Sequence, residues 1–308
     1  MKNQEYFVRN VVKEFRDSLS ACYPPNEINQ YVYMLFENIL GWTKPMIHIN
    51  PDAIIPEECY QKFSLALNEL RQYRPIQYIL GKSWFNGCEI SVDSSVLIPR
   101  PETEELCLLI KTENSNRNYQ DFTILDIGTG SGSIAIYLSI SFPYSRITAI
   151  DISPDALDLA QKNSNRYNCK VHFCKINILN TTESATLPVF DLIVSNPPYV
   201  LESEKSTMPS NVREYEPTAA LFVPDNDPLR FYKAIVGFAQ TNLANPGLIY
   251  FEIHEKFGRE IQLLLQSCGF EKVKVVKDIH GKDRFIRAEK RMIMLDSSYW
   301  YDDKSGVD

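Results

Sequence analysis

The chain of 308 residues is long enough for about two domains of ordinary size. Hydrophobic residues make up 44% of the chain and charged residues 23%, which is typical of a globular protein with a buried core. The net charge of −7, from 32 Lys and Arg against 39 Asp and Glu, disfavours a protein that binds nucleic acid mainly through phosphate contacts.

The first 75 residues predict a small helical bundle. Apolar side chains recur at three- and four-residue steps over residues 7–19, as in an amphipathic helix. Two adjacent prolines interrupt this pattern, and Asn26 can cap a second helix that ends at Gly41. A third helix is expected over residues 56–73. Because residues 1–75 hold 8 basic and 9 acidic side chains, we expect them to dock onto a partner by shape rather than by charge.

In the next segment, residues 76–100, the spacing of apolar side chains changes from that of a helix to every second residue. Apolar side chains alternate over residues 76–80, and the pair Asn86-Gly87 lies between two further apolar runs. Asn-Gly is the strongest short-range signal of a two-residue hairpin turn. We interpret this segment as short strands that form a β-hairpin linker.

Residues 101–290 predict an α/β domain, because strand-like and helix-like runs alternate along them. The expected strands cover residues 122–127, 147–151, 171–176, 190–195, 248–253 and 273–276, and the expected helices cover residues 133–141, 154–167, 228–242 and 256–268. Such alternation implies parallel strands with crossover helices on both faces of a sheet. Residues 291–308 are expected to form a C-terminal tail.

The cysteines and the apolar runs indicate a cytoplasmic protein. Seven cysteines are scattered without a C-x-x-C pair, which disfavours a disulfide scaffold or a zinc ribbon. The first residues carry charges within their apolar pattern, unlike a signal peptide. No apolar run approaches the roughly 18 residues that a membrane span needs. We therefore expect no membrane partner.

A glycine-rich loop follows the expected strand 122–127 and reads Asp126-Ile127-Gly128-Thr129-Gly130-Ser131-Gly132. Glycines let a backbone turn tightly and approach a ligand without Cβ clashes, and the helix that follows offers free N–H groups. By itself this loop is also compatible with a tight strand-to-helix turn that binds nothing.

Asp151 ends the second expected strand, 23 positions after Gly128. An acid at this place can accept hydrogen bonds from both ribose hydroxyls of an adenosine, although it could also only cap the next helix. The loop reads G-x-G-x-G and is followed by Ser133, where a dinucleotide fingerprint has Gly or Ala. The pattern therefore favours S-adenosylmethionine over a nicotinamide dinucleotide.

The sequence Asn196-Pro197-Pro198-Tyr199 follows the expected strand 190–195. Two prolines at a strand end could be only a rigid stop. After a loop of the methyltransferase type, however, the Asn196 side-chain oxygen and the Pro197 carbonyl can accept the two N–H groups of a planar NH₂. This orients the nitrogen lone pair towards a methyl donor, while Tyr199 can pack on the planar face. The prolines preorganise the acceptors, so the motif predicts amino-group methylation.

These motifs and several others together resemble one family, to about residue 290. The further segments that carry the resemblance are Arg74–Gly81, Val96–Glu104, Val212–Pro217, Asp227–Leu229, Phe251–Ile253 and Asp278–Arg284. The family is that of the release-factor-specific protein-(glutamine-N5) methyltransferases, also called PrmC or HemK.

The resemblance implies a Rossmann-like class I methyltransferase fold with a seven-stranded mixed sheet. It implies methyl transfer from S-adenosylmethionine, without a metal, to the glutamine of the Gly-Gly-Gln loop in class 1 peptide chain release factors. The implied cofactor-binding residues are Asp126, Gly128, Thr129, Gly130, Ser131, Gly132, Asp151, Ile152, Asn177, Ile178 and Asn196. The implied catalytic residues are Asn196, Pro197, Pro198 and Tyr199, which also bind substrate together with Pro99, Arg100, Pro101 and Glu102.

Some points depart from the family or stay open. Asn177 stands where the family usually has an acid near the adenine, and its oxygen can still accept a hydrogen bond from the adenine amino group. Residues 200–226 show little periodicity, and their length suggests a lid over the substrate. The alternatives are a DNA or RNA adenine-N6 methyltransferase, and a release-factor-binding module without catalytic activity.

Overall fold

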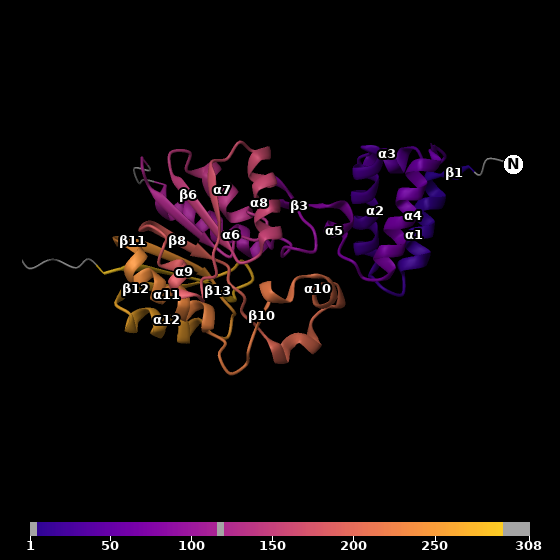
Figure 1. Ribbon diagram of the computed structural model, residues 1–308. Coiled ribbons are helices and arrows are strands. Elements are labelled where there is room, and N and C mark those ends of the chain that lie inside the picture. Colours follow the sequence, from indigo (N-terminus) through magenta and orange to yellow (C-terminus); the bar gives the residue numbers. More distant parts are fainter. Residues whose placement is uncertain (1–4, 116–119, 292–308) are drawn as a thin grey trace, which may run out of the picture.

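The structure is a computed structural model that describes residues 5–115 and 120–291. Apart from Arg291, the expected tail 291–308 lies outside these residues. In Figure 1 the N-terminal helices form one unit, which a short helix and a hairpin join to a larger α/β domain. Among the described residues, no helix is long and apolar enough to cross a membrane.

The N-terminal unit is a helical bundle, as predicted, with its own hydrophobic core. Its elements are β1 (Tyr6–Phe7), α1 (Val8–Leu19), α2 (Pro25–Leu40), α3 (Lys44–Ile49), β2 (Ile54–Ile55) and α4 (Glu57–Arg71). Gly41 ends α2 with φ of 68°, as expected. The expectation that Asn26 caps α2 is wrong. The helix begins at Pro25, two residues earlier than an Asn26 cap would allow, because Pro25 needs no N–H partner in the first turn and has a fixed φ suited to it.

The segment between the units corrects a second expectation. Residues 76–80 form a helix, α5 (Ile76–Leu80), and not a strand. Gly81 ends this helix after five residues with φ of 69°. Five residues are too few to show whether apolar side chains recur at the spacing of a helix or at that of a strand. Ile76 packs into the N-terminal core, whereas Tyr78 packs into the core of the α/β domain. Helix α5 therefore connects the two cores.

The predicted hairpin is confirmed directly after α5. Strands β3 (Lys82–Phe85) and β4 (Cys88–Ser91) pair antiparallel, and Phe85 lies opposite Cys88. Asn86 and Gly87 form the turn with φ of 46° and 81°, the left-handed values that the primed hairpin turns require. Phe85 and Ile90 are buried in the core of the α/β domain, so the hairpin packs against that domain.

The α/β domain is built on a mixed seven-stranded sheet, as the family resemblance implies. Its order is β12-β13-β11-β8-β5-β6-β7, and only β13 runs antiparallel to its neighbours. The strands are β5 (Thr123–Ile127), β6 (Arg146–Asp151), β7 (Val171–Lys175), β8 (Phe190–Ser195), β11 (Leu243–Glu252), β12 (Phe270–Lys277) and β13 (Asp283–Lys290). The six expected strands are thus present, and β13 is an addition.

Helices cover both faces of this sheet, as the alternation predicts. Neighbouring strand residues point to opposite faces, so that Ile124 belongs to one buried cluster and Leu125 to the other. One cluster includes residues of α6 (Pro101–Asn114), α7 (Ser133–Ser141) and α8 (Pro154–Arg166). The other cluster includes residues of α11 (Arg230–Asn242) and α12 (Gly258–Ser267), and the short α9 (Thr181–Ser184) lies beside α11.

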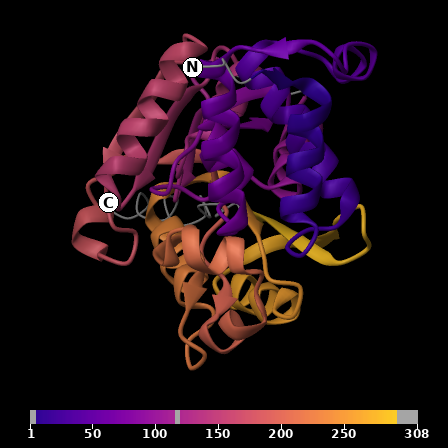
Figure 2. The same cartoon turned by 90° about the vertical axis from the view of Figure 1, so that its right-hand side faces the viewer.

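Residues 200–226 are not an irregular loop but a chain of short elements. These are β9 (Val200–Leu201), η1 (Glu202–Thr207), α10 (Ser210–Tyr215), η2 (Thr218–Ala220) and β10 (Phe222–Val223). Each element is too short to produce a recognisable period. Figure 2 shows this salmon-to-orange segment below the N-terminal helices. The Tyr215 hydroxyl donates a hydrogen bond of 2.7 Å to the carbonyl of Gln72, which links the segment to the N-terminal unit.

Candidate active site

Three strand ends meet at the point where the strand order reverses. Ile127, the last residue of β5, lies opposite Ile150 of β6 on one side and Ser195 of β8 on the other. The glycine loop, Asp151 and the Asn-Pro-Pro-Tyr motif therefore begin side by side. In open α/β sheets, ligands bind in the crevice beyond such a reversal.

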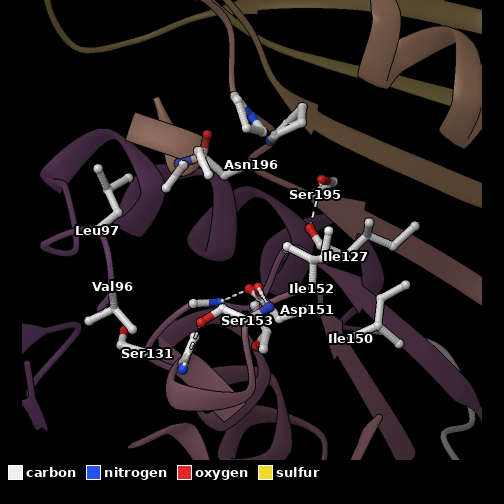
Figure 3. Close-up of a pocket in the computed structure, with 18 of the residues that line it drawn as sticks. Val96, Leu97, Ile127, Ser131, Ile150, Asp151, Ile152, Ser153, Ser195 and Asn196 are labelled. Carbon is white, nitrogen blue, oxygen red and sulfur yellow. Dashed lines mark hydrogen bonds between the residues drawn. The ribbon is translucent and has the colours of Figure 1, made fainter. Parts of the chain in front are cut away.

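A cavity of about 360 Å³ lies at this place. Figure 3 shows Asp151 and Ser153 on one side of it, with Asn196 across from them and Val96 and Leu97 along another wall. The predicted site residues that line the cavity are Gly128, Thr129, Gly130, Ser131, Asp151, Ile152, Asn177, Ile178, Asn196, Pro197, Pro198, Pro99 and Arg100. Those that do not line it are Asp126, Gly132, Tyr199, Pro101 and Glu102.

The glycine loop leaves open space where it faces the cavity. Gly128 and Gly130 have φ of 74° and 53°, and a Cβ placed on either one would meet no atom within 4 Å. Gly132 has another role, since its Cβ would lie 3.0 Å from the Cβ of Ala160. The first two glycines thus keep room beside the loop, and the third allows α7 to approach α8.

Asp151 braces the glycine loop from the end of β6. Its carboxylate accepts hydrogen bonds from the backbone N–H of Gly130, at 2.9 Å, and of Ser153, at 3.0 Å. Burial raises the pKa of Asp151, and these N–H groups partly offset the effect. The alternative role as helix cap belongs to Ser153, whose hydroxyl accepts the N–H of Ala156 at the start of α8.

Asp126 lies beneath the same loop and is completely buried. One carboxyl oxygen accepts a hydrogen bond of 2.7 Å from the Thr129 hydroxyl, whereas the other has no hydrogen-bond partner. Burial raises the pKa of Asp126 to about 7, and the nearby charge of Asp151 acts in the same direction. Asp126 therefore titrates near neutral pH.

The side chain of Asn196 is fixed by a hydrogen bond to a buried hydroxyl. Its side-chain NH₂ donates a hydrogen bond of 3.0 Å to Oγ1 of Thr103, in the first turn of α6. Pro197 and Pro198 follow it along the cavity wall. Tyr199 lies outside the cavity lining, and its hydroxyl donates a hydrogen bond of 2.8 Å to Glu252. The predicted packing of Tyr199 on a substrate stays a prediction.

Arg100 is fixed in the cavity wall by an acid of the 200–226 segment. Its guanidinium contacts Oε1 of Glu216 at 2.6 Å, and the other oxygen of Glu216 accepts the N–H of Ile98 at 3.3 Å. Glu216 is buried, which raises its pKa, and the charge of Arg100 opposes that rise. This ion pair joins the segment to the start of α6.

Asn177 also lines the cavity. Its side-chain oxygen accepts the N–H of Leu179 at 3.0 Å. A carbonyl oxygen has two lone pairs, so a second hydrogen bond, from a ligand, is compatible with this contact. Ile152 and Ile178 contribute apolar surface next to it.

Comparisons with known proteins agree with this geometry. Residues 107–212 match the family model "Methyltransferase small domain", and residues 10–81 match the "PrmC N-terminal domain". The chain is 40% identical over 285 residues to the release factor glutamine methyltransferase of Flavobacterium psychrophilum, which covers 92% of this chain and 99% of that protein. For the enzyme of Bacteroides thetaiotaomicron the identity is 38% over 283 residues, which covers 92% of this chain and 100% of that protein.

The chain belongs to the family of release factor glutamine methyltransferases. The mixed sheet and the N-terminal helical unit are therefore those of a methyltransferase of this family. Within the residues that the structure describes, no three His, Cys, Asp or Glu side chains gather as metal ligands.

Two buried residues of this candidate site have no assigned role in the sequence analysis. They are Thr103, which contacts Asn196, and Glu252 at the end of β11. Both belong to segments that carry the family resemblance. Glu252 directly follows the apolar run Leu248–Phe251, which predicts a buried strand. Because carboxylates are seldom buried without partners, this position could have indicated a role for Glu252.

Proposed function

We propose that this protein transfers a methyl group from S-adenosylmethionine to the side-chain amide nitrogen of a glutamine in class 1 release factors. The target is the glutamine of their Gly-Gly-Gln loop. The observation that carries the proposal is the position of Asn196 and Pro197, which line the same cavity as the glycine loop in a chain of this family.

The residues of the cavity fit the methyl donor. S-adenosylmethionine supplies a methyl group on a positively charged sulfur, which a weak nucleophile can attack. Asp151 would accept the ribose hydroxyls, Asn177 the adenine amino group, and the backbone of Gly128 and Gly130 would lie against the donor. The space that the two glycines leave without a Cβ neighbour is the observation that favours this arrangement.

The chain would act on the glutamine mainly by positioning it. A primary amide has two N–H donors and a nitrogen lone pair weakened by resonance. If the Asn196 oxygen and the Pro197 carbonyl accept both N–H groups, the lone pair is directed at the methyl group. Alignment of two reacting groups at about 3–3.5 Å can contribute roughly 7–11 kcal/mol. S-adenosylhomocysteine is the leaving group as the S–CH₃ bond breaks. A strong general base is not needed, because the nitrogen becomes acidic once it is methylated and can lose its proton to water.

We also propose that the reaction takes place in the cytoplasm, where release factors act in translation. All seven cysteines are free in the structure, which agrees with a reducing compartment. The N-terminal unit would provide contacts with the release factor outside the reacting glutamine.

The test offers the purified protein S-adenosylmethionine with a tritiated methyl group. Release factor, DNA and RNA are supplied in separate reactions, and a release factor whose target glutamine is replaced by alanine is the matched control. We expect label in the intact release factor alone. Label in DNA or RNA would indicate the adenine-N6 alternative, and no label anywhere would favour a binding module without catalytic activity.

A further inference from the structure

The proposed reaction requires one end of the Asn196 amide and not the other. The oxygen can accept a substrate N–H, whereas the NH₂ end would place a donor opposite that N–H. Rotation of the terminal torsion by half a turn exchanges these ends, and the two rotamers have similar intrinsic energies. Neighbouring groups must therefore determine which end faces the substrate.

Thr103 provides such a neighbour, because its hydroxyl has only one hydrogen. That hydrogen is donated to Oε2 of Glu252 over 2.6 Å. The hydroxyl oxygen can then only accept from Asn196, and it lies 3.0 Å from the NH₂ group. Only 4% of Thr103 is exposed, so water does not replace this contact.

Glu252 determines which groups donate and which accept in the hydrogen bonds that connect it with Tyr199, Thr103 and Asn196. One carboxylate oxygen accepts from Thr103 and the other from the Tyr199 hydroxyl, at 2.8 Å. Glu252 is 1% exposed, and both of its oxygens are acceptors in these contacts. Burial raises the pKa of Glu252, and the carboxylate of Glu102 acts in the same direction, whereas the hydrogen bonds from Thr103 and Tyr199 and the charge of Arg284, on β13, oppose the rise.

We infer that Thr103 and Glu252 are positioning residues that hold the Asn196 amide with its oxygen towards the cavity. The inference rests on the proposed function for its catalytic consequence, but the hydrogen-bond chain is a property of the free protein. Three separate elements contribute to it: the first turn of α6, the end of β11 and the loop after β8. Such a network fixes a functional group more firmly than any single contact.

The main variant is Thr103→Val, which keeps the shape of the side chain and removes the hydroxyl. Thr103→Ser restores the hydroxyl, and Thr112→Val is the matched control, because Thr112 lies on the same helix but is exposed. We expect Thr103→Val to bind S-adenosylmethionine as the wild type does and to lose about tenfold or more in kcat with release factor. Thr103→Ser should recover to within about threefold of wild type.

A second measurement does not depend on activity. In protein labelled with ¹⁵N-asparagine, we expect the side-chain N–H groups of Asn196 to exchange with solvent about tenfold faster in Thr103→Val than in wild type. An unchanged exchange rate together with unchanged kcat would overturn the inference. If the wild type methylates nothing while the exchange rates differ as expected, the proposed function fails and the positioning role stands.

Glu252→Gln provides the test if Thr103→Val does not fold. Thr103 and Tyr199 donate to different oxygens of Glu252, and in a glutamine one of these two positions becomes an NH₂ group that cannot accept. We expect a lower kcat and faster exchange of the Asn196 amide, with S-adenosylmethionine affinity unchanged. Wild-type values of kcat and exchange would contradict the inference.

Discussion

At the scale of single residues, Asn196 and Asp151 lie on different walls of one cavity, so their substitutions should affect different steps. We expect Asn196→Ala to keep its affinity for S-adenosylmethionine within a few-fold and to lose turnover. The substrate amide would retain a buried N–H without an acceptor, which costs about 1–3 kcal/mol and also misdirects the nitrogen. Calorimetry and methyl transfer to release factor measure the two quantities. Methylation within about tenfold of wild type would exclude the proposed role.

Asp151→Ala should have the opposite effect and weaken cofactor binding first. The substitution removes the proposed acceptor for the ribose and also the hydrogen bond to the N–H of Gly130. Asp151→Asn is the matched variant, because it keeps one accepting oxygen and should bind S-adenosylmethionine with intermediate affinity. If calorimetry gives the same affinity for Asp151→Ala and wild type, Asp151 only orders the loop.

The raised pKa of Asp126 predicts that cofactor affinity depends on pH. The pKa is about 7, so the carboxyl is mostly neutral below this pH and mostly ionised above it. Because S-adenosylmethionine is positively charged at its sulfur, its binding favours the ionised form, and affinity should rise by up to about tenfold from pH 6 to pH 8. Asp126→Asn cannot ionise and should flatten this dependence. A wild-type affinity that is equal at both pH values would contradict the expectation.

At the scale of elements, the segment 200–226 is tied down at some points and exposed at others. Glu216 is buried against Arg100, and Tyr215 contacts Gln72, whereas most side chains of η1 are exposed. We expect amides of residues 202–207 to exchange rapidly in the free protein and to become protected when release factor is added. Mass spectrometry of hydrogen exchange measures both states. Equal protection in the two states would show that η1 is not part of a lid.

The sequence predicts the elements of the α/β domain well where they are long and amphipathic or strongly apolar. Each of the six expected strands is present, because runs of β-branched residues between turn residues form strands in most contexts. Helix α5 could not be distinguished from a strand in five residues, and the pairing of β13 depends on distant partners. Short elements of the 200–226 segment are stabilised by contacts such as that of Glu216 with Arg100, which no local pattern reveals.

For the candidate site, the sequence predicts which loops lie together but not which buried side chains contact one another. The strand ends that bear the glycine loop, Asp151 and Asn196 follow from the parallel sheet, so their proximity could be expected. The contact of Thr103 with Asn196 spans 93 positions, and that of Thr103 with Glu252 spans 149. Such contacts depend on how α6 packs against the sheet. The spacing of apolar residues predicts which face of α6 is buried, but it does not predict which residues hydrogen-bond with the buried hydroxyl of Thr103.

At the scale of the whole molecule, the glycine loop, Asp151 and Asn196 all belong to the α/β domain. A single glutamine side chain offers few atoms for recognition, so selection of the release factor needs a second contact. We expect the N-terminal unit to supply it. A chain that begins at Pro75 should fold and bind S-adenosylmethionine, yet lose most of its kcat/KM for intact release factor.

A peptide that carries the target loop is the control for this experiment. It should be a poor substrate for both the full and the shortened chain, since it lacks the contacts that orient the glutamine. Circular dichroism would establish that the shortened chain is folded. If the folded, shortened chain methylates release factor as well as the full chain does, the N-terminal unit has another role.

The position of the transferred methyl group tests the central claim most directly. Release factor would be incubated with the protein and S-adenosylmethionine, digested, and sequenced by tandem mass spectrometry. We expect a mass increase of one methyl group on the side chain of the glutamine in the Gly-Gly-Gln loop, and none when Asn196 is replaced by alanine. A methyl group on any other residue, or an unmodified loop after incubation with active wild-type protein, would contradict the account.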